Sequence, residues 1–441
     1  MIRVLTSVNS FVWGAPALLL ILSVGLYLSL RLRFAQITLL PKALKVFFSG
    51  LAGKDRSGFR SLCTALAATV GTGNLVGVAG AICLGGPGAI FWMWICGILG
   101  MITKYAEAVL SVRYRIRGED GFYGGPMYMM ELGLGRRWKF FAILYSLFGL
   151  IASFGIGNAA QINAVVTGIH TLVPELPDFV TGVLLAALIG TLLFGGAKAI
   201  GAAAETLVPF AAAGYTLMCL GVLVLRAEWI PKALSEIVLG AFSPRAVTGG
   251  MLGSSFQALR IGCSRGVFTN EAGMGTAAIA HGGTEVTHPA RQGLLGIMEV
   301  FLDTIVMCTL TALVILVSGV DIPYGQDAGG VLTQRAFASL YGRSAEFFLT
   351  AALCLFAVAT VLGWGLYGTR CAQYLFGSHA WKIYAVAQTA MVLLGAVADT
   401  ALIWQVSETV NGLMAIPNLI TLAALSPEVV RLTKEYRKSG G

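Results

Sequence analysis

Charged residues are scarce in this sequence. Asp, Glu, Lys and Arg make up only 12% of its 441 residues, whereas 57% are hydrophobic and the mean hydropathy is +0.80. A soluble globule of this length needs more polar surface, since about a quarter of the residues in typical soluble domains are charged. The composition therefore excludes a soluble enzyme and predicts an all-α polytopic membrane protein.

The positive charge is not gathered on one surface. The formal net charge is +9, but the basic residues form short clusters between apolar segments, and such clusters orient a chain in the bilayer. We therefore expect lipid and a small solute as partners, and no nucleic acid. A monomer is expected in preference to an oligomer.

Cysteine and histidine are also few. The eight cysteines lie singly inside apolar segments and none belongs to a C-x-x-C pair, so we expect reduced, buried thiols. The four histidines are too far apart in the sequence to suggest a ligand cluster. The sequence thus predicts no cysteine or histidine metal site and no organic cofactor.

One apolar segment contains residues that an uninterrupted membrane helix should lack. Ala67–Leu84 carries four glycines and an asparagine, and the β-branched residues Thr69, Val70 and Thr72 crowd the turn around Gly71. These residues lower helix propensity, so we expect the helix to open between Gly71 and Asn74. In hydrocarbon, freed backbone groups require protein or a hydrated cavity beside them. The segment should therefore line a polar site, where carbonyls hold a cation and N–H groups hold a carboxylate.

A second segment, Gly249–His281, is interrupted in the same way by glycines and by Ser264, Thr269 and Asn270. Each interrupted segment opens a run of about five spans, which indicates an inverted-repeat transporter with its site between the breaks. We predict a five-plus-five fold with broken first and sixth core helices and one extra N-terminal span. The predicted divisions are an N-terminal span and interfacial helix (1–58), a first five-helix repeat (59–226), an external connector (227–247), a second five-helix repeat (248–425) and a cytoplasmic tail (426–441).

The basic clusters predict the orientation. The first apolar run, Phe11–Leu30, is long enough for a span and is followed by Arg31 and Arg33, so we expect it to be retained and not cleaved as a signal peptide. With the basic loops inside, about eleven spans place the N-terminus outside and the C-terminus in the cytoplasm, in the inner membrane. Ile37–Phe48 is either a helix on the inner membrane face or a solvated linker. Both interpretations stay open.

Polar side chains inside the apolar spans are the candidate functional residues. Asn158 and Gln161 share one face of a predicted helix, where they either join helices or contact a solute. Lys104 and Glu107 are three residues apart and are predicted to pair with each other. Four more ionisable residues lie deep in apolar spans, namely Arg260, Arg265, Glu271 and Asp303. A charge pair among these four would close an inner gate or join helices, and for Asp303 we favour the structural role.

Thr360 lies in the middle of a span, four residues before Trp364. Sodium requires several hard oxygen ligands, which a threonine hydroxyl and the carbonyls of a broken helix can supply. The competing interpretation is that the hydroxyl bonds to the carbonyl four residues earlier, which is common for threonine in membrane helices.

One motif favours a different function. Gly262–Gly266 matches G-x-S-x-G, which in hydrolases requires a strand, a sharp turn and a helix. The surrounding sequence has no strand pattern, and His281 lies far along the same segment. An intramembrane serine hydrolase using Ser264 is therefore the alternative to transport, and a passive channel is the third candidate.

Four stretches of this sequence resemble the alanine or glycine:cation symporter family of bacteria and archaea. They are TVGTGNLVGVAGAICLGGPGAIFWMW, FGIGNAAQINA, RGVFTNEAGMGTAAIAH followed by THPARQG, and DTIVMCTLTALVILVSG. That family belongs to the amino acid, polyamine and organocation group of transporters. The resemblance implies a five-plus-five inverted-repeat fold and alternating access. It also implies a secondary active symporter that imports small neutral amino acids, alanine and glycine, with sodium or, alternatively, protons.

The resemblance also implies roles for individual residues. The residues implied to contact the amino acid are Thr72, Gly73, Asn74, Gln161, Phe268, Thr269, Asn270 and Trp364. Sodium would bind the carbonyls of Ala67 and Val70 and the hydroxyl of Thr360. Many family members carry Ser-Thr where this chain has Ala359-Thr360, so one side-chain ligand is missing here.

Overall fold

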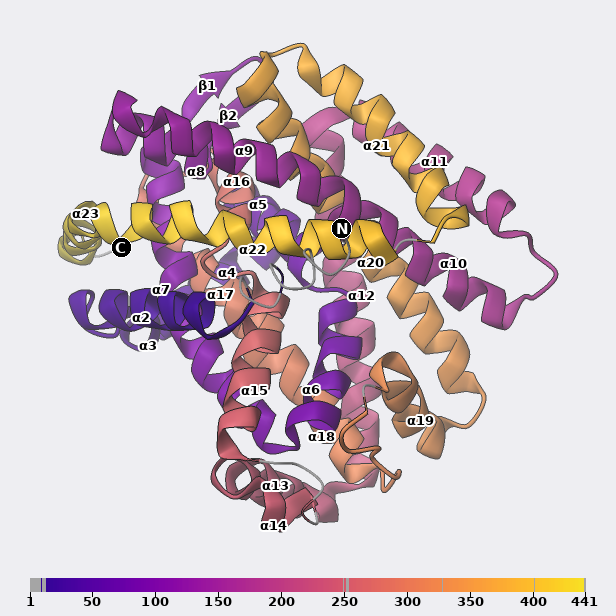
Figure 1. The fold of residues 1–441 in the computed structure, drawn as a ribbon. Coiled ribbons are helices and arrows are strands. Elements are labelled where there is room, and N and C mark those ends of the chain that lie inside the picture. Colours follow the sequence, from indigo (N-terminus) through magenta and orange to yellow (C-terminus); the bar gives the residue numbers. More distant parts are fainter. Residues whose placement is uncertain are drawn as a thin grey trace.

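The computed structural model describes residues 9, 13–248, 250, 254–326, 328–399 and 401–439, and these residues are helical apart from loops and one short hairpin (Figure 1). Six helices in this part of the chain are long and apolar enough to cross a membrane, and the number is eight if each of two bent pairs counts as one span. The six are Gly88–Arg113, Arg136–Leu172, Gly196–Leu225, Pro289–Val317, Ser344–Phe376 and Ala380–Val397. The bent pairs are Arg56–Thr69 with Gly73–Gly85, and Gln405–Ala424 with Ser426–Lys438.

The first half of the chain begins with helices where the N-terminal span was predicted. Its elements are α2 (Ala15–Arg31), α3 (Ala35–Thr38), α4 (Leu40–Leu51), α5 (Arg56–Thr69), η1 (Gly73–Gly77), α6 (Val78–Gly85), α7 (Gly88–Arg113), β1 (Ile116–Gly118), β2 (Gly121–Tyr123), α8 (Pro126–Tyr128), η2 (Met129–Leu134), η3 (Arg136–Trp138), α9 (Lys139–Phe154), η4 (Gly155–Ala159), α10 (Ala160–Leu172), α11 (Asp178–Phe194) and α12 (Gly196–Leu225). The predicted first span starts at Phe11, which lies outside the described residues. Most of Ile37–Phe48 is helical, but its place at the membrane surface stays a prediction.

The second half repeats the pattern of a broken helix followed by longer ones. Its elements are η5 (Ala227–Trp229), α13 (Ile230–Phe242), α14 (Pro244–Thr248), α15 (Ser255–Asn270), α16 (Thr276–Gly282), α17 (Pro289–Val300), η6 (Phe301–Cys308), α18 (Thr309–Val317), α19 (Gly329–Tyr341), α20 (Ser344–Phe376), α21 (Ala380–Val397), α22 (Ala401–Ala424) and α23 (Ser426–Lys438). η1, η2, η4 and η6 are π-helical stretches, in which backbone carbonyls are released from the regular helical ladder.

Both predicted interruptions are breaks in the helix. Helix α5 ends at Thr69, Val70 adopts an extended conformation (φ −76°, ψ 106°), and the chain bends by 53° before the next helix. The second break follows Asn270 and uses positive φ angles of 52° at Glu271, 93° at Gly273 and 80° at Gly275. Glycine adopts this conformation without strain, which explains the two glycines there. The prediction of two broken helices is confirmed.

Helices from the two halves pack against each other. Helix α7 contacts α15, α16 and α17, while α9 contacts α20 and α22. Helices α11 and α21 pack together and lie side by side in Figure 1. The two breaks therefore lie within a bundle to which both halves contribute. The boundaries of the two five-helix repeats stay a prediction.

The outer helices expose apolar side chains. Large hydrophobic residues are solvent-exposed along α11, α12 and α21, for example Leu184, Phe210, Leu217, Val224 and Ile383. A soluble monomer rarely exposes apolar area on this scale. These faces are suited to contact with the hydrocarbon of a membrane.

Candidate functional site

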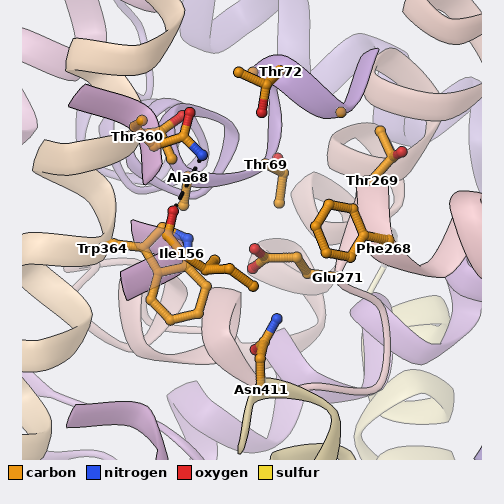
Figure 2. Close-up of a pocket in the computed structure, with 13 residues that line it drawn as sticks. Ala68, Thr69, Thr72, Ile156, Phe268, Thr269, Glu271, Thr360, Trp364 and Asn411 are labelled. Carbon is orange, nitrogen blue, oxygen red and sulfur yellow. Dashed lines mark hydrogen bonds between the residues drawn. The ribbon is translucent and has the colours of Figure 1, made fainter. Parts of the chain in front are cut away.

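A small cavity lies between the two breaks and encloses about 30 Å3 (Figure 2). Its lining comes from both broken segments, from η4 and α10, and from α20 and α22. The lining residues are Ala68, Thr69, Gly71, Thr72, Gly73, Ile156, Gln161, Phe268, Thr269, Glu271, Thr360, Trp364 and Asn411. Most of the residues that the resemblance implies for binding the amino acid or sodium are part of this lining. The exceptions are Asn74, Asn270, Ala67 and Val70.

Glycines let the first break approach the second half of the chain. A Cβ atom on Gly71 would lie 3.0 Å from Thr360 Oγ1, and one on Gly73 would lie 3.3 Å from Thr269 Oγ1. Both distances are shorter than ordinary van der Waals contact, so a larger residue at either position would displace its neighbour. Two hydroxyl groups from distant helices therefore lie directly beside the unwound backbone.

The first break also releases a carbonyl beside this point. In a continuing helix the N–H of Gly71 would donate to the carbonyl of Ala67, but here it donates to Asn74 Oδ1 at 3.0 Å. The Thr360 hydroxyl donates to the Phe356 carbonyl at 2.9 Å. Because a hydroxyl oxygen keeps its lone pairs when it donates, this bond leaves Thr360 able to coordinate a cation. The two interpretations of Thr360 are therefore compatible.

Asn74 and Asn270 are buried and bond to the π-helical stretch η6. Asn74 Nδ2 donates to Asp303 Oδ1 at 2.8 Å, and Asn270 Nδ2 donates to Thr304 Oγ1 at 3.2 Å. Asn270 Oδ1 also accepts from the N–H of Ala272 at 3.0 Å. Both amides thus hold the two breaks in place from behind the cavity.

The cavity contains oxygen acceptors that lack donors. Gln161 Nε2 donates to the Ile156 carbonyl at 3.1 Å, which orients its Oε1 atom. Gln161 Oε1 and Asn411 Oδ1 are both buried without a hydrogen-bond partner in the described part of the chain. The carboxyl group of Glu271 also lines the cavity, and its Oε2 atom accepts from the Thr276 hydroxyl at 2.6 Å. Figure 2 shows Glu271 and Asn411 directed toward the same space.

Two of these residues were not predicted to contact the solute. Glu271 could have been predicted from the sequence, because an ionisable residue inside a broken membrane helix is a functional candidate by default. No sequence feature distinguished Asn411 from the other polar residues of its span. The amide pair on α10 and η4 divides between its two interpretations: Asn158 Nδ2 joins helices by donating to the Gln388 carbonyl at 2.8 Å, while Gln161 faces the cavity.

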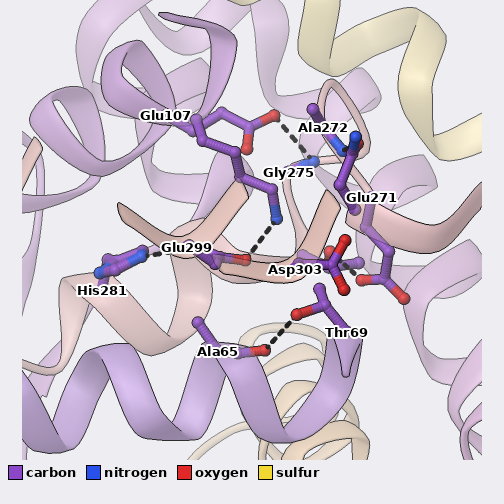
Figure 3. A network of polar contacts seen from close by, with 12 residues as sticks. Ala65, Thr69, Glu107, Glu271, Ala272, Gly275, His281, Glu299 and Asp303 are labelled. Carbon is purple, nitrogen blue, oxygen red and sulfur yellow. Dashed lines mark hydrogen bonds and ion pairs between the residues drawn. The ribbon is translucent and has the colours of Figure 1, made fainter. Parts of the chain in front are cut away.

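A buried charge network supports the second break (Figure 3). Lys104 Nζ lies 2.8 Å from Glu299 Oε1, and His281 Nε2 lies 2.9 Å from Glu299 Oε2. Glu107 Oε1 accepts from the N–H groups of Gly273 and Gly275 at 3.0 and 3.1 Å. The predicted pair between Lys104 and Glu107 is therefore wrong. Both partners lie in the second half of the chain. Lys104 pairs with Glu299, and Glu107 accepts from the unwound backbone, whose N–H groups need an acceptor.

The serine hydrolase geometry is not present. Ser264 lies inside helix α15, and the residues of this helix that precede it, from Ser255 on, form neither a strand nor a sharp turn. The two ring nitrogens of His281 are hydrogen-bonded to Glu299 and Gln292, at 2.9 and 2.7 Å. Ser264 is therefore not presented as a nucleophile with this histidine as its base.

A larger cavity of about 540 Å3 lies toward the hairpin. Thr64 lines this cavity and Ala68, one helical turn later, lines the smaller one. The turn and the second strand of the hairpin contact α20, where Arg370 donates to both carboxylate oxygens of Asp120 at 3.1 Å and lies over the Tyr123 ring. Burial raises the pKa of Asp120, but the hydrogen bonds and charge of Arg370 outweigh it and hold this pKa below its ordinary value.

A helical bundle with two broken helices around a small polar cavity is typical of secondary transporters. The fold is similar to the crystal structure of MhsT in complex with L-phenylalanine, with a TM-score of 0.57 and 14% identity, covering 85% of this chain and 97% of that chain. This likeness concerns the fold alone.

The sequence comparisons identify the family. The sodium:alanine symporter family matches residues 1–440. The chain is 43% identical to the sodium/alanine symporter of Methanococcus maripaludis, with 99% of this chain and 97% of that protein covered. It is 37% identical to the probable sodium/glutamine symporter of Bacillus subtilis, with 98% and 89% covered. The chain belongs to the sodium:alanine symporter family, and it is a multi-pass membrane transporter and not an enzyme. The predictions of family and fold class are confirmed.

Proposed function

We propose that this protein imports small neutral amino acids, alanine and glycine, together with sodium by alternating access. The observation that carries the proposal is the cavity of about 30 Å3 between the two breaks. It combines unwound backbone on one side with oxygen acceptors on the other, which suits a small zwitterion. The following steps assign each part of the substrate and the ion.

The carboxylate of the substrate binds at the first break. The first N–H groups of a helix have no partner within that helix and carry partial positive charge. Thr72 and Gly73 line the cavity where η1 begins, so their N–H groups are suited to donate hydrogen bonds to a carboxylate there. Asn74 does not line the cavity, but its side chain accepts from the N–H of Gly71 and so holds the backbone of the break in position.

The ammonium group of the substrate binds the acceptors opposite. An ammonium group has three donors and no acceptor, so it satisfies Gln161 Oε1 and, with the amide turned so that its oxygen faces the cavity, Asn411 Oδ1; both atoms otherwise lack partners. The Glu271 carboxyl group provides the third acceptor and a compensating charge. Leaving such atoms unpaired costs about 1–3 kcal/mol each, which favours a ligand that donates to them.

The size of the cavity selects the side chain. Trp364 is fully buried and lines the cavity, and a Cβ on Gly157 would collide with its side chain. The indole is thus held in place and cannot easily yield to a longer substrate. This favours alanine and glycine over glutamine, which the Bacillus subtilis relative is named for.

Sodium binds beside the same break. Its ligands are the carbonyls of Ala67 and Val70 and the hydroxyl of Thr360, and Asn74 accepting from Gly71 leaves the first of these carbonyls available. With Ala359 in place of a serine, the site has one side-chain oxygen fewer than in many relatives. Each sodium ion that enters at a membrane potential of about 100 mV supplies roughly 2.3 kcal/mol, enough for tens-fold accumulation.

The larger cavity near Thr64 is the exit to the cytoplasm. This follows if the basic clusters face inward, with the N-terminus outside and the C-terminus in the cytoplasm of the inner membrane. Opening the path between the two cavities, while the outer side stays closed, completes one half of the transport cycle.

Counterflow of labelled alanine in proteoliposomes tests the proposal. We expect uptake against a concentration gradient with inward sodium, competition by glycine, and little competition by glutamine. Stimulation by an inward proton gradient in place of sodium would reassign the ion, and competition by glutamine equal to that by alanine would overturn the substrate class. Flux that never runs uphill would indicate a passive channel.

A further inference from the structure

Asp303 occupies a central position behind the site. It lies in η6, is fully buried, and belongs to neither broken segment. Hydrogen bonds nevertheless extend from its carboxylate to both breaks. Figure 3 shows Asp303 between the first break at Thr69 and the second break at Glu271 and Ala272.

The first arm runs to the first break. The N–H of Gly71 donates to Asn74 Oδ1 at 3.0 Å, and Asn74 Nδ2 donates to Asp303 Oδ1 at 2.8 Å. Asn74 Nδ2 also lies 3.1 Å from the backbone carbonyl of Asp303. Because the Gly71 N–H requires an acceptor, the orientation of the Asn74 amide is determined, and its NH2 group must face Asp303.

The second arm runs to the second break and has the same polarity. The N–H of Ala272 donates to Asn270 Oδ1 at 3.0 Å, so the NH2 group of this amide faces Thr304, at 3.2 Å from Oγ1. The Thr304 hydroxyl then donates to Asp303 Oδ2 at 2.8 Å. Each carboxylate oxygen of Asp303 thus terminates one chain of donors that begins at a backbone N–H in a break.

We propose that Asp303 is a positioning residue that couples the sodium site at the first break to the part of the substrate site at the second break, the Glu271 carboxyl group. This inference rests on the proposed function. Sodium at the carbonyls of Ala67 and Val70 orders the backbone at Gly71, and the two arms pass that order to Ala272. Ala272 follows Glu271, whose carboxyl group lines the substrate cavity. Part of the gain in substrate affinity on sodium binding is therefore transmitted through these hydrogen bonds of the protein.

An uncharged side chain of the same shape tests this role. The amide in Asp303→Asn can accept from only one arm, because its NH2 group faces a donor on the other. In purified protein, alanine binding is measured by calorimetry over a range of sodium concentrations. Coupling between sites usually changes affinity by roughly 5–150-fold. We expect the sodium-dependent gain in alanine affinity to fall at least fivefold in Asp303→Asn, with sodium-free alanine affinity changed less than about twofold.

A second variant keeps the test decisive if Asp303→Asn does not fold. Thr304→Val retains the carboxylate and cuts only the second arm, and we expect it to reduce the sodium-dependent gain as well. Thr311→Val is the matched control. It removes a buried hydroxyl in α18, bonded to the Met307 carbonyl and to Tyr215, without touching either arm.

The outcomes separate this inference from the proposed function. If the unaltered protein shows no effect of sodium on alanine binding, the proposed function fails. If it shows the effect and both variants keep it in full, Asp303 has no coupling role. An equal loss of alanine affinity with and without sodium would mean that the residue only supports the fold, which would also overturn the inference.

Discussion

The hydroxyl oxygen of Thr360 lies so close to Gly71 that a Cβ on the glycine would be 3.0 Å from it. Thr360 belongs to α20, whereas Gly71 belongs to the first break, about 290 positions earlier in the chain. This proximity places the Thr360 hydroxyl, the only side-chain ligand proposed for sodium, beside the break whose carbonyls are the other proposed ligands.

Thr360→Ala removes this ligand. A contact to a charged group is worth about 1.5–3 kcal/mol, so we expect the sodium concentration for half-maximal alanine uptake to rise tenfold or more. Thr360→Ser should restore most of the affinity. Thr369→Ala is the control, since Thr369 makes the same bond to a carbonyl four residues earlier, at 2.7 Å, but does not line the cavity. Unchanged sodium dependence in Thr360→Ala would remove the residue from the site.

Asn411→Leu removes one acceptor for the substrate ammonium group. We expect the KM for alanine to rise about tenfold while the sodium dependence stays nearly constant, because the lost contact is to the substrate alone. Thr409→Val on the same helix is the control, since its hydroxyl donates to the Gln405 carbonyl at 2.8 Å and Thr409 is not part of the cavity lining. An unaltered KM in Asn411→Leu, measured by initial uptake rates, would contradict the proposed ammonium site.

Trp364→Leu enlarges the cavity on the side of the substrate side chain. We expect alanine uptake to weaken, since apolar contacts are lost, and larger neutral amino acids such as glutamine to begin competing. Competition assays with a series of amino acids of increasing length measure this change. If the variant remains restricted to alanine and glycine, another residue sets the size limit.

The buried pair between Lys104 and Glu299 governs stability. Glu299→Gln leaves Lys104 charged and unpaired in the interior, where both side chains are at most 1% exposed. We expect a loss of about 3–5 kcal/mol in the free energy of unfolding, as for other broken buried pairs.

The double variant Lys104→Met with Glu299→Gln should regain much of that loss, because no uncompensated charge is left behind. Thermal unfolding in detergent compares the three proteins. A Glu299→Gln variant as stable as the unaltered protein would show that the pair contributes little to stability.

The positions of the helix breaks and of the apolar segments follow from the amino-acid sequence alone. Helix opening near Gly71 and near Gly273 depends on local propensity, since glycine and crowded β-branched residues act within one turn. The apolar spans are likewise visible along the chain, because each must be long enough to cross hydrocarbon.

Which polar group faces which partner depends instead on how the helices pack in the folded protein. Asn74 follows the first break and Asn270 precedes the second, yet their amides bond to Asp303 and Thr304, whereas Asn411 lines the cavity from a span with no distinguishing pattern. The direction of a side chain in a helix bundle depends on how helices far apart in the sequence are rotated and packed. That rotation arises from many contacts at once, so no local pattern in the chain encodes it.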